Sequence, residues 1–106
     1  MKTRRTFIIA GLALFVAPLS SAMAADHQVS IKSFKFSPAQ ITVAAGDTIT
    51  FTNEDGAPHT GTALDGSFDT GRLNKGDSGT VTLSSAGSFE FKCNFHPNMK
   101  GTVTVN

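Results

Sequence analysis

The chain has 106 residues, with nine lysines and arginines against eight aspartates and glutamates, and its formal net charge at pH 7 is +1. Three of the basic residues lie within the first five positions, so the remainder carries six basic and eight acidic residues and a net charge of −2. A mildly acidic chain without a basic run argues against nucleic acid or an anionic membrane as its partner.

The first 24 residues have the features of a cleavable export signal. Lys2, Arg4 and Arg5 form a charged segment, residues 7–19 form an apolar run, and Ala22-Met23-Ala24 supplies a small-x-small cleavage pattern. The run is shorter than the ~20 residues that span a bilayer, so we expect removal of the segment and no stable membrane insertion. The two adjacent arginines resemble a twin-arginine motif, and they also suit an ordinary Sec signal. Both export routes remain open.

Cleavage after Ala24 leaves residues 25–106, one small domain of 82 residues. Domains of this size often rely on a metal or a covalent staple. Cys93 is the single cysteine, so an internal disulfide is excluded, and the thiol is intermolecular, free or occupied by a ligand. We expect a soluble, monomeric periplasmic protein.

Short strands with a period of two follow one another from Val29 to the end of the chain, without a convincing helical period. The apolar positions that define them are, in chain order, Val29 and Ile31, Phe34 and Phe36, Ile41 and Val43, Ile49 and Phe51, Val81 and Leu83, Phe89 to Cys93, and Val103 and Val105. A change of phase predicts a bulge or bend near Ser33, and we expect residues 60–71 to be irregular with short strand pieces. Turn signals separate the strands. The pattern predicts an all-β protein, an antiparallel β-sandwich or barrel of about seven to eight strands.

A loop near the C-terminus carries three metal-ligand types. In Cys93-x-x-His96-x-x-Met99 a thiolate, an imidazole and a thioether lie within seven residues. Phe91 is expected to point inward, so Cys93, two residues further along the strand, should do the same. Soft sulfur ligands with an imidazole suit copper better than a hard cation. A trigonal site with a long axial sulfur needs a second imidazole, and His59 is available.

The ordered combination of short motifs resembles the cupredoxins, the small type 1 blue copper proteins, and most of all their amicyanin and pseudoazurin-type members. The motifs are Phe34-x-Phe36-x-Pro38, Ile41-Thr42-Val43, Gly46-Asp47-Thr48-Ile49, Phe51-Thr52-Asn53, Pro58-His59-Thr60 and Cys93-x-x-His96-x-x-Met99. The resemblance implies a Greek-key sandwich with one type 1 copper per chain. It implies that His59, Cys93 and His96 bind copper in a plane, with Met99 as the weak axial ligand.

The resemblance also implies what the neighbouring residues do. Thr60 occupies the position that ties the first histidine's strand to the cysteine loop, and Phe91 the position where members carry an aromatic residue, often tyrosine. The implied function is one-electron transfer between Cu(II) and Cu(I), with redox partner proteins docking transiently near His96. Phe95 and Pro97 would belong to the docking patch, although ordinary loop packing explains them equally well.

Three other functions compete with the electron carrier. Copper delivery or buffering would use the same ligands. An enzyme is disfavoured, because copper oxidases and nitrite reductases of this fold need additional histidine-rich sites and only His27 lies outside the proposed site. A structural zinc site is disfavoured because such sites prefer Cys and His without a thioether.

Two further features have competing explanations. The terminus Ala25-Asp26-His27 could hold Cu(II) or Ni(II) in a square plane of nitrogen donors, but a histidine at the third position of a frayed terminus can also be accidental. The acidic residues are expected to form a solvated face rather than an acidic docking patch. They include Glu54, Asp55, Asp65, Asp69 and Asp77.

Overall fold

The computed structural model describes residues 24–106, and these form eight strands. The strands are β1 Asp26–Lys32, β2 Lys35–Ser37, β3 Gln40–Val43, β4 Thr48–Asn53, β5 Thr62–Ala63, β6 Ser78–Thr82, β7 Gly87–Lys92 and β8 Lys100–Val105. Within the described residues no helix is long and apolar enough to cross a membrane. The predicted export signal lies, apart from Ala24, outside them.

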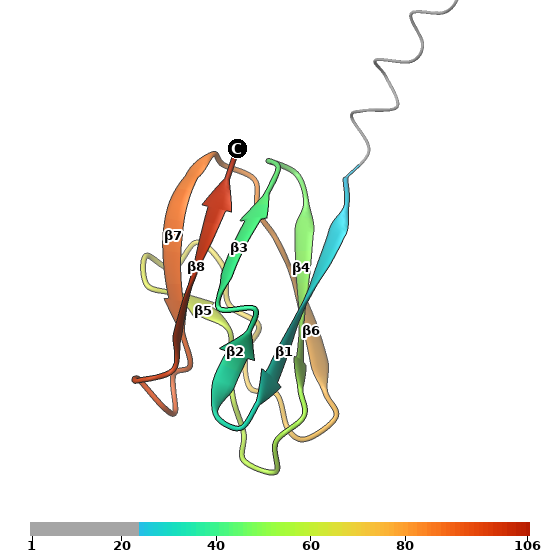
Figure 1. Ribbon diagram of the computed structural model, residues 1–106, viewed down its shortest axis with the longest axis vertical. Helices are drawn as coiled ribbons and strands as arrows, with labels where there is room; N and C mark the ends of the chain where they lie inside the picture. Colours follow the sequence, from blue (N-terminus) through green and yellow to red (C-terminus); the bar gives the residue numbers. More distant parts are fainter. Residues whose placement is uncertain (1–23) are drawn as a thin grey trace, which may run out of the picture.

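Two four-stranded sheets face each other (Figure 1). One has the strand order β2-β1-β4-β6 and the other β3-β8-β7-β5. The prediction of an all-β sandwich with seven to eight strands is therefore confirmed. Non-consecutive neighbours in both sheets mean that the chain passes repeatedly from one sheet to the other, as a Greek-key arrangement requires.

Two strand pairs of this mainly antiparallel sandwich are parallel. β1 runs parallel to β4, with Val29 beside Phe51, and β3 runs parallel to β8, with Ile41 beside Val103. The other four pairings are antiparallel. The alternation of apolar residues indicates which face of a strand is buried, but it carries no information on the direction of the neighbouring strand.

The expected change of phase near Ser33 is a tight turn between β1 and β2. Ser33 and Phe34 have φ angles of 54° and 56°, and Lys32 pairs with Lys35 across the turn. Positive φ at both central residues is the geometry of a type I′ hairpin, which usually takes Asn-Gly. Phe36 is consequently buried, whereas Phe34 is 48% exposed.

Aromatic rings from both sheets meet in the core. Phe36 lies 4.8 Å from Phe91 and 6.0 Å from Phe51 between ring centroids, and Phe51 lies 5.5 Å from Phe91. Edge-to-face pairs of this kind add about 0.5–1.5 kcal/mol each beyond their buried area. Phe91 also covers Gly101 so closely that a Cβ at Gly101 would collide with the ring. The inner faces of the two sheets are thus packed tightly against each other around Phe91, on the strand that leads to Cys93.

The strand directions define two ends of the sandwich. β1, β4 and β7 finish, and β2, β6 and β8 start, at the end where the loops carry His59 and Cys93, which we call the His59 end. The opposite end, which we call the Asp47 end, holds the start of β1 and the turn between β3 and β4. In Figure 1 the His59 end is at the bottom.

The Asp47 carboxylate joins several segments at its end. It accepts hydrogen bonds from the Ala25 and Ala44 N–H groups, each at 2.9 Å, and contacts His27 Nε2 at 2.9 Å. Chiefly the Ala25 hydrogen bond, followed by those of His27 and Ala44, lowers the pKa of Asp47 from 3.8 to about 2. The start of β1 is therefore fastened to the turn between β3 and β4.

This geometry predicts how the stability of the metal-free protein depends on pH. Because the pKa of Asp47 is lower in the folded chain than in the unfolded chain, its stabilising effect is complete above about pH 4 and is lost as the pH falls towards 2. Asp47→Asn should lower the free energy of unfolding at neutral pH and flatten its pH dependence in that window. Urea unfolding at a series of pH values measures both effects.

A matched control is Glu90→Gln, which removes an exposed carboxylate from β7. This variant should keep the parent's pH dependence. An Asp47→Asn variant with the parent's slope between pH 4 and 2 would contradict the role assigned to the carboxylate.

Candidate metal centre

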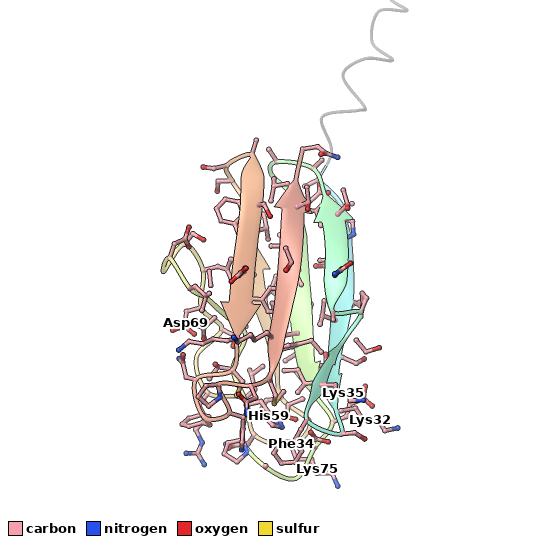
Figure 2. All side chains as sticks on the ribbon, turned by 60° about the vertical axis from the view of Figure 1, so that its left-hand side comes forward. Lys32, Phe34, Lys35, His59, Asp69 and Lys75 are labelled. Carbon is pink, nitrogen blue, oxygen red and sulfur yellow. The ribbon has the colours of Figure 1, made fainter. Side chains whose placement is uncertain are left out.

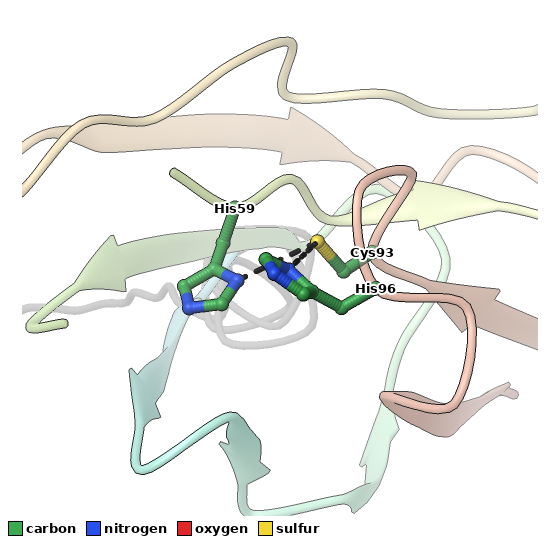
Figure 3. A group of neighbouring side chains, drawn as sticks. All are labelled: His59, Cys93 and His96. Atoms are coloured by element: carbon green, nitrogen blue, oxygen red, sulfur yellow. Dashed lines mark hydrogen bonds between the residues drawn. The ribbon is translucent and has the colours of Figure 1, made fainter. Parts of the chain in front are cut away.

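Three side chains from two distant segments converge at the His59 end. The Cys93 sulfur lies 3.5 Å from His59 Nδ1 and 3.6 Å from His96 Nδ1 (Figure 3). The three ligand atoms all lie within 4.8 Å of one another. The mid-chain imidazole expected from the sequence therefore stands beside the cysteine, and both histidines direct the same ring nitrogen towards the sulfur.

Cys93 points inward because it continues the alternation of β7. Phe91 and Cys93 are both fully buried. The chain then turns tightly, with hydrogen bonds from His96 N–H to the Cys93 carbonyl at 3.3 Å and from Met99 N–H to the His96 carbonyl at 2.9 Å. A further bond from Cys93 N–H to the Met99 carbonyl, at 3.2 Å, closes the loop. Met99 itself is 5% exposed, so its thioether is buried in the loop that holds the other sulfur.

Backbone and side-chain hydrogen bonds fix the position of His59. His59 and Leu73 form an isolated bridge, with N–H to carbonyl distances of 3.1 and 2.8 Å. The Asn53 side-chain amide donates to the carbonyls of Ala57 and Leu73, both at 2.8 Å. His59 is fully buried as a result, although it lies in a loop.

Asp55 orients the His59 ring, which corrects the expectation that this carboxylate belongs to a solvated face. Its Oδ2 lies 3.0 Å from His59 Nε2, and the two oxygens accept the Ser33 and Phe34 N–H groups at 2.8 and 2.9 Å. A carboxylate can only accept, so Nε2 carries the proton and the lone pair of Nδ1 faces the Cys93 sulfur. Burial by itself raises the pKa of Asp55, but the hydrogen bonds from Phe34, Ser33 and His59 outweigh it and the pKa lies below its ordinary value.

Thr60 joins the two segments that form the site. Its N–H points to the Cys93 sulfur at 3.4 Å, and its hydroxyl accepts the Asn94 N–H at 2.9 Å. The same hydroxyl lies 2.8 Å from Thr62 Oγ1. The short Thr60 side chain therefore reaches the cysteine loop directly.

An exposed apolar surface covers the site, formed by Phe34, Phe95, His96 and Pro97 and called here the apolar patch. The Phe34 ring meets the His59 and His96 rings edge-on, with centroids 5.0 and 4.8 Å apart. Phe34 and Phe95 are 48% and 46% exposed, Pro97 is exposed and His96 is half-buried. His96 therefore links the buried site to this surface.

Sequence reasoning missed two of these residues, Phe34 and Asp55. The sequence pattern identifies Phe34 only as an apolar position beside a change of phase, and it is the tight turn that brings the ring to the histidines. The signal for Asp55 was its position four residues before His59, a spacing that also fits an ordinary polar loop.

His27 lies at the other end of the sandwich. Its ring contacts Asp47, and its residue pairs with Ile49 in the parallel register of β1 and β4. His27 is therefore not brought to the Cys93 site. A separate metal site at Ala25-Asp26-His27 stays a hypothesis.

Replacing Asp55 should weaken the hydrogen bonds that hold the Ser33–Phe34 turn and the His59 ring. In Asp55→Asn one of the two acceptors becomes an amide donor, which faces either the Ser33 N–H or both the Phe34 N–H and His59 Nε2, so we expect the metal-free protein to lose about 1–3 kcal/mol of stability. Urea unfolding measures this loss. Glu54→Gln changes the exposed neighbouring carboxylate in the same way and should be close to neutral; equal losses in the two variants would contradict the orienting role.

Replacing the Thr60 hydroxyl should release the cysteine loop. Thr60→Val keeps the shape but removes the acceptor of the Asn94 N–H, so we expect a loss of about 1–2 kcal/mol and faster hydrogen exchange at the Asn94 amide. Thr104→Val, at an exposed position of β8, is the control. Unchanged exchange at Asn94 would show that the hydroxyl does not hold the loop.

The sequence is similar to those of known copper proteins. Residues 5–105 match the family model described as a cupredoxin-like domain. An amicyanin of Paracoccus denitrificans is 28% identical over 96 residues, which cover 84% of this chain and 73% of the amicyanin. Plastocyanin A/B of Petroselinum crispum is 39% identical over 84 residues, which cover 67% of this chain and 87% of the plastocyanin.

Solved structures agree with the sequence relatives. A purple cupredoxin from Nitrosopumilus maritimus superposes with a TM-score of 0.69 at 29% identity, over 76% of this chain and 100% of that one. A Cu-containing nitrite reductase from Thermus scotoductus superposes with a TM-score of 0.70 at 26% identity, but the match covers only 22% of that enzyme chain. The sandwich, the converging ligands and these matches agree, and the chain belongs to the cupredoxin family.

Proposed function

We propose that this protein is a one-electron carrier that would hold a single type 1 copper through His59, Cys93 and His96, with the Met99 thioether as a further, weaker ligand. The observation that carries the proposal is the convergence of two imidazole Nδ1 atoms on the buried Cys93 sulfur, at 3.5 and 3.6 Å. Membership of the cupredoxin family and the relatives named amicyanin and plastocyanin support it.

The donor set fits copper. A thiolate with two imidazoles and a nearby thioether is the combination typical of blue-copper sites, whereas structural zinc sites use Cys and His without a thioether. Bound there, copper would supply a one-electron couple between Cu(II) and Cu(I).

The residues of the chain position the ligands, exclude water from them and connect the site to the protein surface. His59 and Cys93 are fully buried, so bulk water is kept from the ligand atoms. Asp55 and Thr60 hold His59 and the cysteine loop in place. Because these hydrogen bonds already hold the ligands in place, little structural change would accompany oxidation or reduction of the bound copper. The half-buried His96 offers a short route to the apolar patch, where a redox partner would dock transiently.

The cellular setting belongs to the same proposal. We infer that residues 1–24 direct export to the periplasm, by the Sec or the twin-arginine route, and that residues 25–106 act there as a soluble monomer. The start of β1 at Asp26, directly after the proposed cleavage point, supports this division.

Copper delivery on the same fold is the competing function. It would require ready release of the metal, which the burial of His59 and Cys93 disfavours. An enzymatic role finds less support: within residues 24–106 the third histidine, His27, contacts Asp47 at the far end, and the match to the nitrite reductase covers a small part of that enzyme.

Copper loading of the mature protein tests the proposal. One equivalent of Cu(II) should give an intense blue colour that disappears on one-electron reduction and returns on oxidation, because Cys93 would supply a thiolate ligand to the copper. Cys93→Ser should lose the colour, and Met99→Leu should keep it with a changed reduction potential. Absorption, electron paramagnetic resonance and voltammetry provide the measurements.

The control is His27→Ala, which should keep both the colour and the potential. A Cu(I)-specific chelator separates the two functions: the carrier retains its metal after reduction, and a delivery protein surrenders it. A colourless copper complex, or a colour that survives in Cys93→Ser, would reject the site.

A further inference from the structure

The basic residues of the domain gather at one end, although the sequence spreads them out. Lys32 ends β1 and Lys35 starts β2, while Lys92 ends β7 and Lys100 starts β8. The other two flank Leu73, the bridge partner of His59: Arg72 directly precedes it, and Lys75 lies between it and β6. All six lysines and arginines of residues 24–106 therefore lie at the His59 end (Figure 2 labels three of them).

The acidic residues are distributed differently. Four lie at the His59 end, namely Glu54, Asp55, Asp69 and Asp77, and four lie elsewhere, namely Asp26, Asp47, Asp65 and Glu90; Asp69 belongs to the first group because its bridge partner Thr62 pairs with Lys92. The net charge of −2 is therefore unevenly distributed. Positive charge is in excess around the site, and the charged side chains in the rest of residues 24–106 are all acidic.

The positive groups are not neutralised by close ion pairs. Within residues 24–106 the ion pairs are His27–Asp47 and His59–Asp55, so no lysine or arginine takes part. Asp55 is turned inward to His59 and the Ser33–Phe34 turn, and Asp77 accepts the Asn74 N–H at 2.9 Å. The cationic side chains are therefore available to a partner.

These cations surround the apolar patch. Phe34 lies between Lys32 and Lys35 in the hairpin, and Figure 2 shows Lys32, Lys35 and Lys75 around it. The Arg72 guanidinium lies 5.7 Å from the centre of the Phe95 ring. An apolar centre with a charged rim is the usual anatomy of a docking interface, and rim charges set the rate and selectivity of encounter.

We propose that the redox partner of this protein presents a carboxylate-rich rim around an apolar centre, and that the positive end selects it. This inference rests on the proposed electron-carrier function. Nucleic acid and anionic lipid are less suited to this surface, because four carboxylates lie at the same end as the cations and aromatic rings occupy the centre.

Small charged oxidants test the sign of the charge around the site, and they do so without knowledge of the partner. Oxidation of the reduced, copper-loaded protein by ferricyanide, a trianion that accepts one electron, should slow down as ionic strength rises, whereas oxidation by tris(1,10-phenanthroline)cobalt(III), a trication that accepts one electron, should accelerate. A protein that behaved as a uniform charge of −2 would show the opposite signs. Either reversed sign would overturn the proposal.

Matched variants locate the effect. Lys32→Gln and Lys75→Gln should each slow ferricyanide oxidation about fourfold at low ionic strength, as expected for one charge about 10 Å from a trianion. Ser85→Asp changes the net charge equally but at the exposed turn before β7, at the Asp47 end, and should have a much smaller effect. Equal effects of the two kinds of variant would overturn the proposal.

A peptide probe tests the class of partner, and it works without copper. A hexa-aspartate peptide should shift amide signals of residues 32–35, 72–75 and 92–100 in the metal-free protein. No shifts, shifts elsewhere, or binding to anionic phosphatidylglycerol vesicles or a DNA duplex in place of the peptide would overturn the inference. Failure to form the blue copper site would instead reject the proposed function, so the two failures are distinguishable.

Discussion

Two hydrogen bonds across the end of the sandwich hold the rest of the site together. The Thr60 N–H points to the Cys93 sulfur, and the Asn94 N–H reaches the Thr60 hydroxyl. They connect segments more than thirty positions apart in the chain. They extend the pairing of β5 with β7, in which Thr62 lies opposite Lys92, as far as the loops that carry His59 and Cys93. The hydrogen bond to the Cys93 sulfur at this junction is buried, so water does not compete with the Thr60 N–H there.

The core below the junction gives it a rigid base. Phe36, Phe51 and Phe91 interlock, and Phe91 rests on Gly101, where a side chain would not fit. The strand leading into Cys93 and the strand leaving Met99 are therefore clamped by the same ring. A loop whose two ends are held this closely has few conformations open to it, which favours one arrangement of its ligands.

The sequence predicts the fold class and the three converging side chains because both rest on local patterns. A period of two reveals which strand faces are buried, and the Cys93 loop carries its ligands within a few residues. Strand direction could not be predicted in this way, which is why the parallel pairs β1–β4 and β3–β8 were missed. Asp55 was hidden for a related reason: its partners come from its own loop and from a turn more than twenty residues away. The collection of six cations at one end follows only from the topology, since none is adjacent to another in the domain.

The Ser33–Phe34 turn has a consequence for how the outside of the molecule communicates with its interior. Two non-glycine residues with positive φ are costly, by about 1–2 kcal/mol each, and the Asp55 carboxylate that stabilises them is the one that holds the His59 ring. A visiting protein that displaces the Phe34 ring would pull on that carboxylate. Contact with the exposed Phe34 ring and the orientation of the buried His59 ring are therefore coupled through the Asp55 carboxylate.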